Sequence, residues 1–304
     1  MPDFGIMRGF NEKLFGDKLV AGQLPTQLGL IGSQQVQDLK FFNFSVKTDN
    51  LSTGSSTSTQ FQMPLTTSTG LNMQVNWGDG SAIETITNHT LAIHTYASAG
   101  TYNVSVTGDI LGWRFNDGGD KLKMLNVSNW EGLTISVDSG FFGCLNLTAT
   151  AIDAPLITGA SLLRYFRDCF NFNGAIGNWN ISNVTNMLST FQSATAFNQN
   201  IGSWNTSSVT DMRFMFNAAT AFNQNIGSWN VSNVTAFVGF MQDKTAANYS
   251  ATNLDSIYNG WSSRTVQPNL SITFNSIKYT AAGVAGKLLL TSAPNNWTIT
   301  DGGI

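Results

Sequence analysis

Apolar residues recur in the middle of the chain at a fixed spacing of 25 residues. The segments 171–187, 196–212 and 221–237 align without gaps. The shared columns are Phe172/Phe197/Phe222, Ile176/Ile201/Ile226, Trp179/Trp204/Trp229 and Val184/Val209/Val234. Such a period is typical of a solenoid, in which each rung buries its apolar face against its neighbours. We therefore expect one set of side chains to be mostly buried: Phe191, Phe197, Ile201, Trp204, Val209 and Met212.

Two spacings alternate inside each unit. Val184, Met187, Phe191 and Ala194 follow one another at intervals of 3, 4 and 3 residues, which places them on one face of a short helix. The segment 201–204 is too short for a helix and is expected to be extended. Each unit is thus predicted to be a helix, a turn and a strand. Weaker copies extend upstream, because Phe141 and Phe166 continue the column of Phe191 and Phe216.

Residues 38–112 show the period of two that is typical of strands. Phe42, Phe44 and Val46 alternate with polar residues at the start of this region. Short strand-like segments follow at 61–65, 73–77, 85–90, 91–96 and 101–108. Asp79-Gly80 is a tight hairpin signal between two of them.

Residues 246–304 lack the repeat and are expected to cap it, since a solenoid must cover its last apolar rung. Leu254, Ile257, Tyr258 and Trp261 lie on one side of a predicted helix. A strand, a second helix over 281–290 and a final strand follow.

Two parts of the chain resemble known families. Residues 75–108 resemble the PKD-type immunoglobulin-like sandwich, with the matching residues Trp77, Gly78, Asp79, Gly80, His94, Thr95, Tyr96, Gly100, Thr101, Tyr102, Val104 and Val106. The repeats, above all 166–237, resemble the BspA-like leucine-rich repeats of bacterial surface proteins, and the tail from Trp297 to Gly303 resembles their closing unit.

These patterns and resemblances predict a mainly β fold with short helices. An N-terminal anchor arm over 1–32 precedes a PKD-like β-sandwich over 33–112. A solenoid of leucine-rich-repeat type over 113–245 and a capping unit over 246–304 complete the predicted organisation.

Charge is scarce in this 304-residue chain. Only 11% of the residues are charged, against about a quarter in typical domains, and the net charge is −3. This balance gives no long-range attraction to nucleic acid or to an anionic membrane. No run of 18 apolar residues occurs, so we expect no membrane insertion. The first residues carry charges where a signal peptide would have an apolar core.

Residues with catalytic potential are few, and we expect no enzyme, no catalytic residue, no metal site and no cofactor. His89 and His94 do not share a metal-ligand spacing with Cys144 and Cys169, and no nucleophile or phosphate-binding motif occurs. The two cysteines instead share one column with Ala194 and Ala219. Whether they form a disulfide stays open.

Amide side chains form the candidate binding residues of the repeats: Asn198, Gln199, Asn200, Asn223, Gln224 and Asn225. Stacked amides can hydrogen-bond to one another along the stack, or they can present donors and acceptors to sugar hydroxyls. The repeated Trp residues favour a core role over a sugar-stacking platform.

Three functions follow from these features. The first is a phage virion protein, for capsid decoration or host attachment, whose N-terminal arm docks on other virion proteins in a homo-oligomer. The apolar anchor residues would be Phe4, Ile6, Phe10, Leu14 and Phe15. Its external partner would be a host surface glycan or protein. The alternative, implied by the BspA-like resemblance, is an adhesin at the bacterial cell surface or outside the cell. A secreted glycan-active enzyme is the third, and the paucity of carboxylates in the repeats counts against it.

Overall fold

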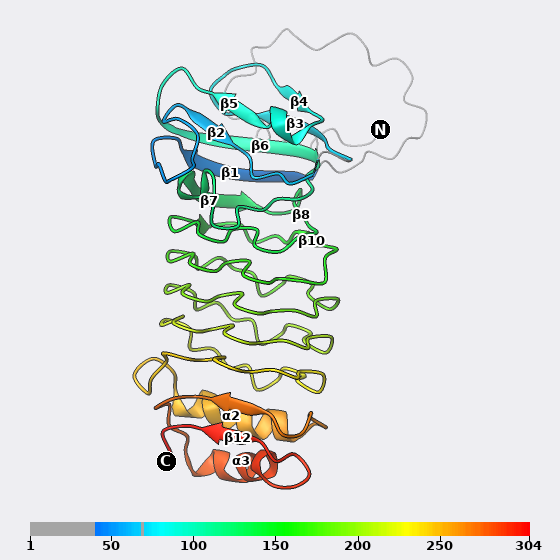
Figure 1. Cartoon of the computed structure of the whole chain (residues 1–304), viewed down its shortest axis with the longest axis vertical. Helices are drawn as coiled ribbons and strands as arrows, with labels where there is room; N and C mark the ends of the chain where they lie inside the picture. The colour runs from blue at the N-terminus through cyan, green and yellow to red at the C-terminus, as the bar shows by residue number, and fades with distance from the viewer. Residues whose placement is uncertain (1–39, 68–69) are drawn as a thin grey trace, which may run out of the picture. The chain divides into compact units, whose positions relative to one another are not determined.

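The computed structural model describes residues 40–67 and 70–304. Contacts divide the chain into two units, Met1–Asp38 and Leu39–Ile304, and the second holds all of the described residues. This unit is mainly β with few short helices, as the sequence predicts. Figure 1 shows most of its strands at one end, a series of stacked turns in the middle and the helices, with β12 beside them, at the other end.

One six-stranded sheet runs from the first strands into the repeats. Its strands in spatial order are β4 (Glu84–Ile86), β3 (Asn72–Asn76), β6 (Thr101–Asp109), β1 (Phe41–Lys47), β7 (Met124–Asn129) and β9 (Thr148–Ala149). Pairing is antiparallel up to β1–β7, whereas β7 and β9 are parallel. Along β1 the predicted alternation is confirmed, because Phe42, Phe44 and Val46 are buried and their neighbours are half-buried.

Shorter elements complete the first part of the unit. The strand β2 (Gln60–Gln62) pairs antiparallel with β5 (Ile93–Thr95). Further on, β8 (Thr134–Ile135) and β10 (Leu156–Ile157) pair in parallel. Two single turns of 3₁₀-helix, η1 (His89–Leu91) and η2 (Lys121–Lys123), lie in the connections.

Residues 160–244 form what we call the repeat stack, in which each 25-residue unit is a rung. Alternate backbone N–H groups donate to the next rung, as from Arg164 to Leu188 O and from Phe166 to Thr190 O, both at 2.9 Å. The residues between them close turns within their own rung, as Tyr165 does by donating to Leu162 O at 3.0 Å. Isolated parallel bridges join the rungs in the order Ser161, Asn186, Asp211 and Ala236.

The predicted helix in each rung is wrong, because the segment is a row of consecutive turns. Ser189 and Ser193 have positive φ angles of 57° and 60°, and Phe214 and Ala218 repeat this in the next rung. A residue in the left-handed conformation at every fourth position interrupts the right-handed helical backbone, so no regular helix can extend through the segment. The backbone N–H groups that a helix would use internally are then directed at the neighbouring rung.

Aromatic columns fill the stack. The rings of Phe166, Phe191 and Phe216 lie face to face, with centroids 5.9 and 5.8 Å apart. All six side chains that the spacing predicts to be buried are at most 4% exposed. Trp179 and Trp204 are 3% and 4% exposed and Trp229 is fully buried. The core interpretation of the Trp column is therefore confirmed.

Helices cover the last rung. α2 (Ala251–Ser262) begins after Ser250, whose hydroxyl accepts the backbone N–H of Asn253, and it buries the four apolar residues that the sequence assigns to it. In the Trp column, the indole Nε1 groups of Trp204 and Trp229 donate to Ile176 O and Ile201 O of the preceding rung, both at 3.0 Å. The Nε1 of Trp261 continues this series beyond the repeats by donating to Ile226 O at 3.1 Å. α3 (Val284–Thr291) follows the turn η3 (Ala281–Gly283), and β11 (Ser271–Thr273) pairs in parallel with β12 (Thr298–Thr300).

The two cysteines are buried and free. They lie in the same column of adjacent units, and the thiol of Cys169 donates to Phe141 O at 3.0 Å. Burial raises the pKa of both thiols well above the ordinary value. A neutral, enclosed thiol is a poor nucleophile, so these side chains serve packing.

Candidate binding surface

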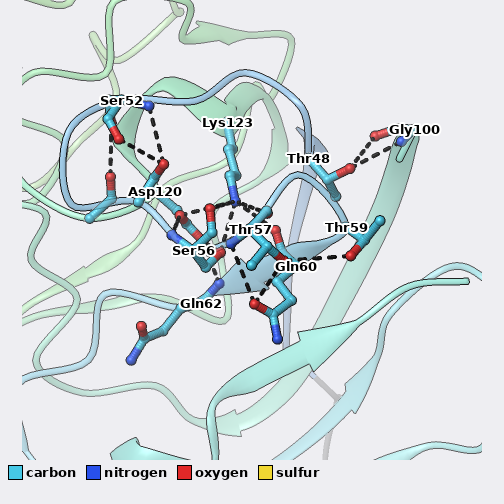
Figure 2. Close-up of polar contacts among 12 residues, drawn as sticks. Thr48, Ser52, Ser56, Thr57, Thr59, Gln60, Gln62, Gly100, Asp120 and Lys123 are labelled. Atoms are coloured by element: carbon cyan, nitrogen blue, oxygen red, sulfur yellow. Dashed lines mark hydrogen bonds and ion pairs between the residues drawn. The ribbon is translucent and has the colours of Figure 1, made fainter. Parts of the chain in front are cut away.

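A buried ion pair holds the loop before β2 against the turn before β7. Lys123 Nζ lies 3.1 Å from Asp120 Oδ1, and both side chains are almost completely buried. Lys123 also donates to the carbonyls of Ser56, Thr57 and Gln60, while Asp120 accepts from Ser56 and Gln62 (Figure 2). Every contact is internal, and burial lowers the pKa of Lys123 despite the carboxylate beside it. This cluster fastens a loop and leaves no group for a ligand.

His94 sits in a second polar cluster. Its ring stacks on Trp77 with centroids 4.9 Å apart, and its nitrogens lie 2.8 Å from Asp79 Oδ2 and 3.2 Å from Glu84 Oε1. The hydrogen bond with Ser81, and then the contact with His94, hold the pKa of Asp79 well below its ordinary value. Within residues 40–67 and 70–304, no group of three or more His, Cys, Asp or Glu side chains is arranged to hold a metal ion.

The predicted amides form a ladder along the repeat stack. Asn173 Oδ1 accepts the backbone N–H of Asn198 at 2.9 Å, and Asn198 Oδ1 accepts that of Asn223 at the same distance. The side-chain amides of Gln199 and Gln224 donate to the carbonyl and the Oδ1 of the Asn one rung before. Ser250 and Asn253 of the cap then bind Asn223 in the same way. We call this series of contacts the amide ladder.

Asn200 and Asn225 are exposed beside the ladder and turn the same atom inward. Their Oδ1 atoms accept the backbone N–H groups of Gly202 and Gly227 at 3.0 and 2.9 Å. These contacts stabilise the corner that leads to the Trp column. The structure thus brings together all six amides that the sequence selects, and it shows that they also hold the stack together.

Sequence reasoning missed several members of this surface. Asn173 stands in the column of Asn198, so the repeat alignment alone would have found it. Asn180, Asn205 and Asn230 accept the backbone N–H two residues on in three successive rungs, and this spacing also repeats every 25 residues. The anchor residues Phe4, Ile6, Phe10, Leu14 and Phe15 lie outside the described residues.

Replacing Asn198 by alanine should lower the free energy of unfolding by about 1–2 kcal/mol, because two donors in the next rung lose their acceptor. Asn198→Asp keeps an oxygen at that position and should cost less. Urea unfolding of both variants measures the difference. Equal stability of the two variants would show that the ladder oxygen contributes nothing.

None of the helices in the described part of the chain is both long and apolar enough to cross a membrane. Comparison with known proteins adds one match. Residues 160–279, less than half of the chain, match the family described as "Mycoplasma protein of unknown function, DUF285". No curated protein and no solved structure matches the chain.

Proposed function

We propose that the chain is a non-enzymatic surface-repeat protein of BspA-like type that binds a partner outside the cell through its repeat stack. The observation that carries this proposal is the stack itself, with its aromatic columns inside and its polar columns repeated at the surface. Each rung contacts only its neighbours, which gives a long, regular surface suited to binding extended partners.

The fold assignment behind this proposal is a leucine-rich-repeat-like solenoid joined to a PKD-like sandwich. Hydrogen bonds from one rung to the next and the parallel bridges support the solenoid. For the sandwich, the support is the antiparallel set β4-β3-β6-β1 together with the β2–β5 pair. Trp77, which carries the PKD-type resemblance, is fully buried among these strands.

The family match favours the cell-surface alternative over the virion protein. It covers the same repeats whose residues resemble the BspA-like unit, and that resemblance belongs to bacterial surface proteins. The virion hypothesis depends on an anchor over residues 1–32, which lie outside the described residues.

Labelling of intact cells tests the proposal. An antibody against the full chain should label unpermeabilised cells that produce the protein, and brief protease treatment of those cells should remove the label. Phage particles purified from a lysate of the same culture provide the comparison. Label that is confined to such particles, or found only after permeabilisation, would overturn the cell-surface function.

A further inference from the structure

The orientation of each amide on the repeat stack follows from its partner. A backbone N–H can be accepted only by the oxygen of an Asn side chain, so the Nδ2 group must point away from that contact. Asn198 accepts from Asn223 N, and Asn200 accepts from Gly202 N, so both present Nδ2 on their outer side. Gln199 instead donates inward to Asn173 O, which leaves its Oε1 as the outward group.

The same outward groups recur in successive rungs. Asn186 accepts the backbone N–H of Leu188 in a column whose next member is Asp211. In three other columns, eight Asn side chains use Oδ1 for a backbone N–H and have no internal partner for Nδ2: Asn173, Asn180, Asn198, Asn200, Asn205, Asn223, Asn225 and Asn230. Seven of them are exposed and Asn230 is half-buried. Gln199 and Gln224 add one outward acceptor to each of two rungs. Residues 198–200 and 223–225 therefore present a donor, an acceptor and a donor in two successive rungs, about 4.8 Å apart.

The inward contacts alone do not require asparagine. Asp accepts a backbone N–H in the same type of turn, and this chain uses Asp79, Asp211 and Asp301 in that way elsewhere. At the eight positions the residue is Asn each time. No charged residue occurs at all between Cys169 and Thr210. What Asn supplies and Asp lacks is the outward N–H donor.

We propose that this surface, made of the eight Asn and the two Gln residues, binds a neutral polysaccharide along the stack. The inference rests on the proposed function and names its ligand class. A sugar hydroxyl both donates and accepts, so an amide donor beside an amide acceptor suits neighbouring hydroxyls. Because the surface carries no charge, an uncharged chain loses no ion hydration on binding.

The geometry also indicates how the ligand is held. The Trp residues of the rungs are buried, so no aromatic ring of that column stacks on a sugar. Each rung then contributes only a few hydrogen bonds to exposed groups, and affinity depends on how many rungs one polymer engages. Binding should therefore increase with polymer length and be weak for single sugars.

Affinity electrophoresis of the full chain tests the proposal. The gels contain dextran, mannan, xyloglucan or mixed-linkage β-glucan, with polygalacturonate as the charged comparator. We expect at least one neutral polymer to retard the protein more strongly than polygalacturonate does. Retardation by none of the neutral polymers, or by polygalacturonate alone, would overturn the proposal.

A pair of variants assigns the binding to this surface. Asn198→Asp combined with Asn223→Asp keeps the inward oxygens and replaces the outward donors by acceptors, so the dissociation constant for the retarding polymer should rise roughly tenfold or more. Asn200→Ser combined with Asn225→Ser replaces each outward amide by a shorter hydroxyl without adding charge and should weaken binding in the same direction. Gln242→Glu is the control, because it adds one charge at an exposed side chain in the row of turns. Unchanged binding in both double variants, or an equal loss in the control, would contradict the assigned surface.

This test separates the ligand from the proposed function. Surface labelling of intact cells together with no retardation in any neutral gel would reject the polysaccharide and keep the surface protein. Retardation that depends on the amides, without surface labelling, would keep the ligand and reject the cell-surface location.

Discussion

Replacing Trp204 by alanine should lower the free energy of unfolding by ~3–5 kcal/mol, the range expected for truncating a buried Trp. The indole is 4% exposed and its centroid lies 6.1 Å from that of Phe191. Its Nε1 donates to Ile176 O in the preceding rung at 3.0 Å. Truncation therefore removes apolar burial, leaves a cavity between rungs and takes the donor from a buried carbonyl.

Thermal and urea unfolding of three variants separate these effects. Trp204→Phe keeps one aromatic ring and loses the donor and part of the buried apolar area, so it should cost less than Trp204→Ala. Ser203→Ala, at the exposed neighbour, removes one hydrogen bond to Gly177 O and should cost about 1 kcal/mol or less. If Trp204→Ala unfolds like the unmodified protein, the Trp column does not carry the stability of the stack.

The 25-residue columns predict the core of the repeats correctly, because apolar side chains that recur at one position of every rung are the ones that pack against each other. Phe191, Phe197 and Trp204 are placed by alignment without knowledge of the backbone. The backbone itself is not determined by that pattern. Intervals of 3, 4 and 3 residues suit a helix and also suit successive turns, and the left-handed conformation of Ser189 and Ser193 decides for turns. Neither Ser nor its neighbours signal this in sequence.

Long-range pairing was also beyond the sequence. The predicted end of the sandwich at residue 112 falls between β6 and β7, and one sheet contains both strands. Phe44 pairs with Val104 on one side and with Val127 on the other. Local patterns give the period of a strand, whereas its neighbours depend on contacts that are distant along the chain.

The candidate surface could be predicted in its residue types and not in its chemistry. Repetition identifies Asn198 and Asn223, and the structure confirms that they lie in adjacent rungs. Which atom faces outward depends on the backbone N–H groups beneath, such as that of Gly202 under Asn200. Those contacts cannot be derived from the sequence, because they depend on the positions of the backbone turns. The same holds for Lys123 and Asp120, whose burial follows from the packing of the loop before β2.

A lysine ends the repeat stack. The column of Cys144, Cys169, Ala194 and Ala219 holds small residues, and its next member is Lys244, which is fully buried. In earlier rungs the carbonyl at the position of Thr220 accepts a backbone N–H and a Thr hydroxyl from the following rung, as Thr195 O does. Thr220 O accepts Lys244 Nζ instead, at 3.3 Å, and Ala219 O accepts the same group at 2.7 Å. The Lys244 ammonium thus takes the place of the donors that a further rung would supply.

No carboxylate among the described residues lies within 4 Å of Lys244 Nζ, and the facing aromatic group is Tyr249, whose ring centroid is 5.9 Å away. Burial lowers the pKa of Lys244 to about 7, from 10.5 in the unfolded chain. Between these two values the unfolded chain binds more protons than the folded protein, so the free energy of unfolding rises with pH. Below about pH 7 both states are protonated and the penalty for burying the charge is fully present.

The unmodified protein should therefore gain stability relative to Lys244→Met as pH rises from 7 to 10, by up to about 1.4 kcal/mol per pH unit. Urea unfolding of both proteins at each pH unit from 6 to 10 measures this difference, and subtraction removes the titration of all other groups. Lys278→Met, at an exposed lysine, should show no such slope. A Lys244→Met difference that stays constant over this range would mean that the carbonyls and the Tyr249 ring solvate the ammonium as well as water does. The stack would then end on a lysine that stays charged over this range, and Lys244 would add nothing to the pH dependence of its stability.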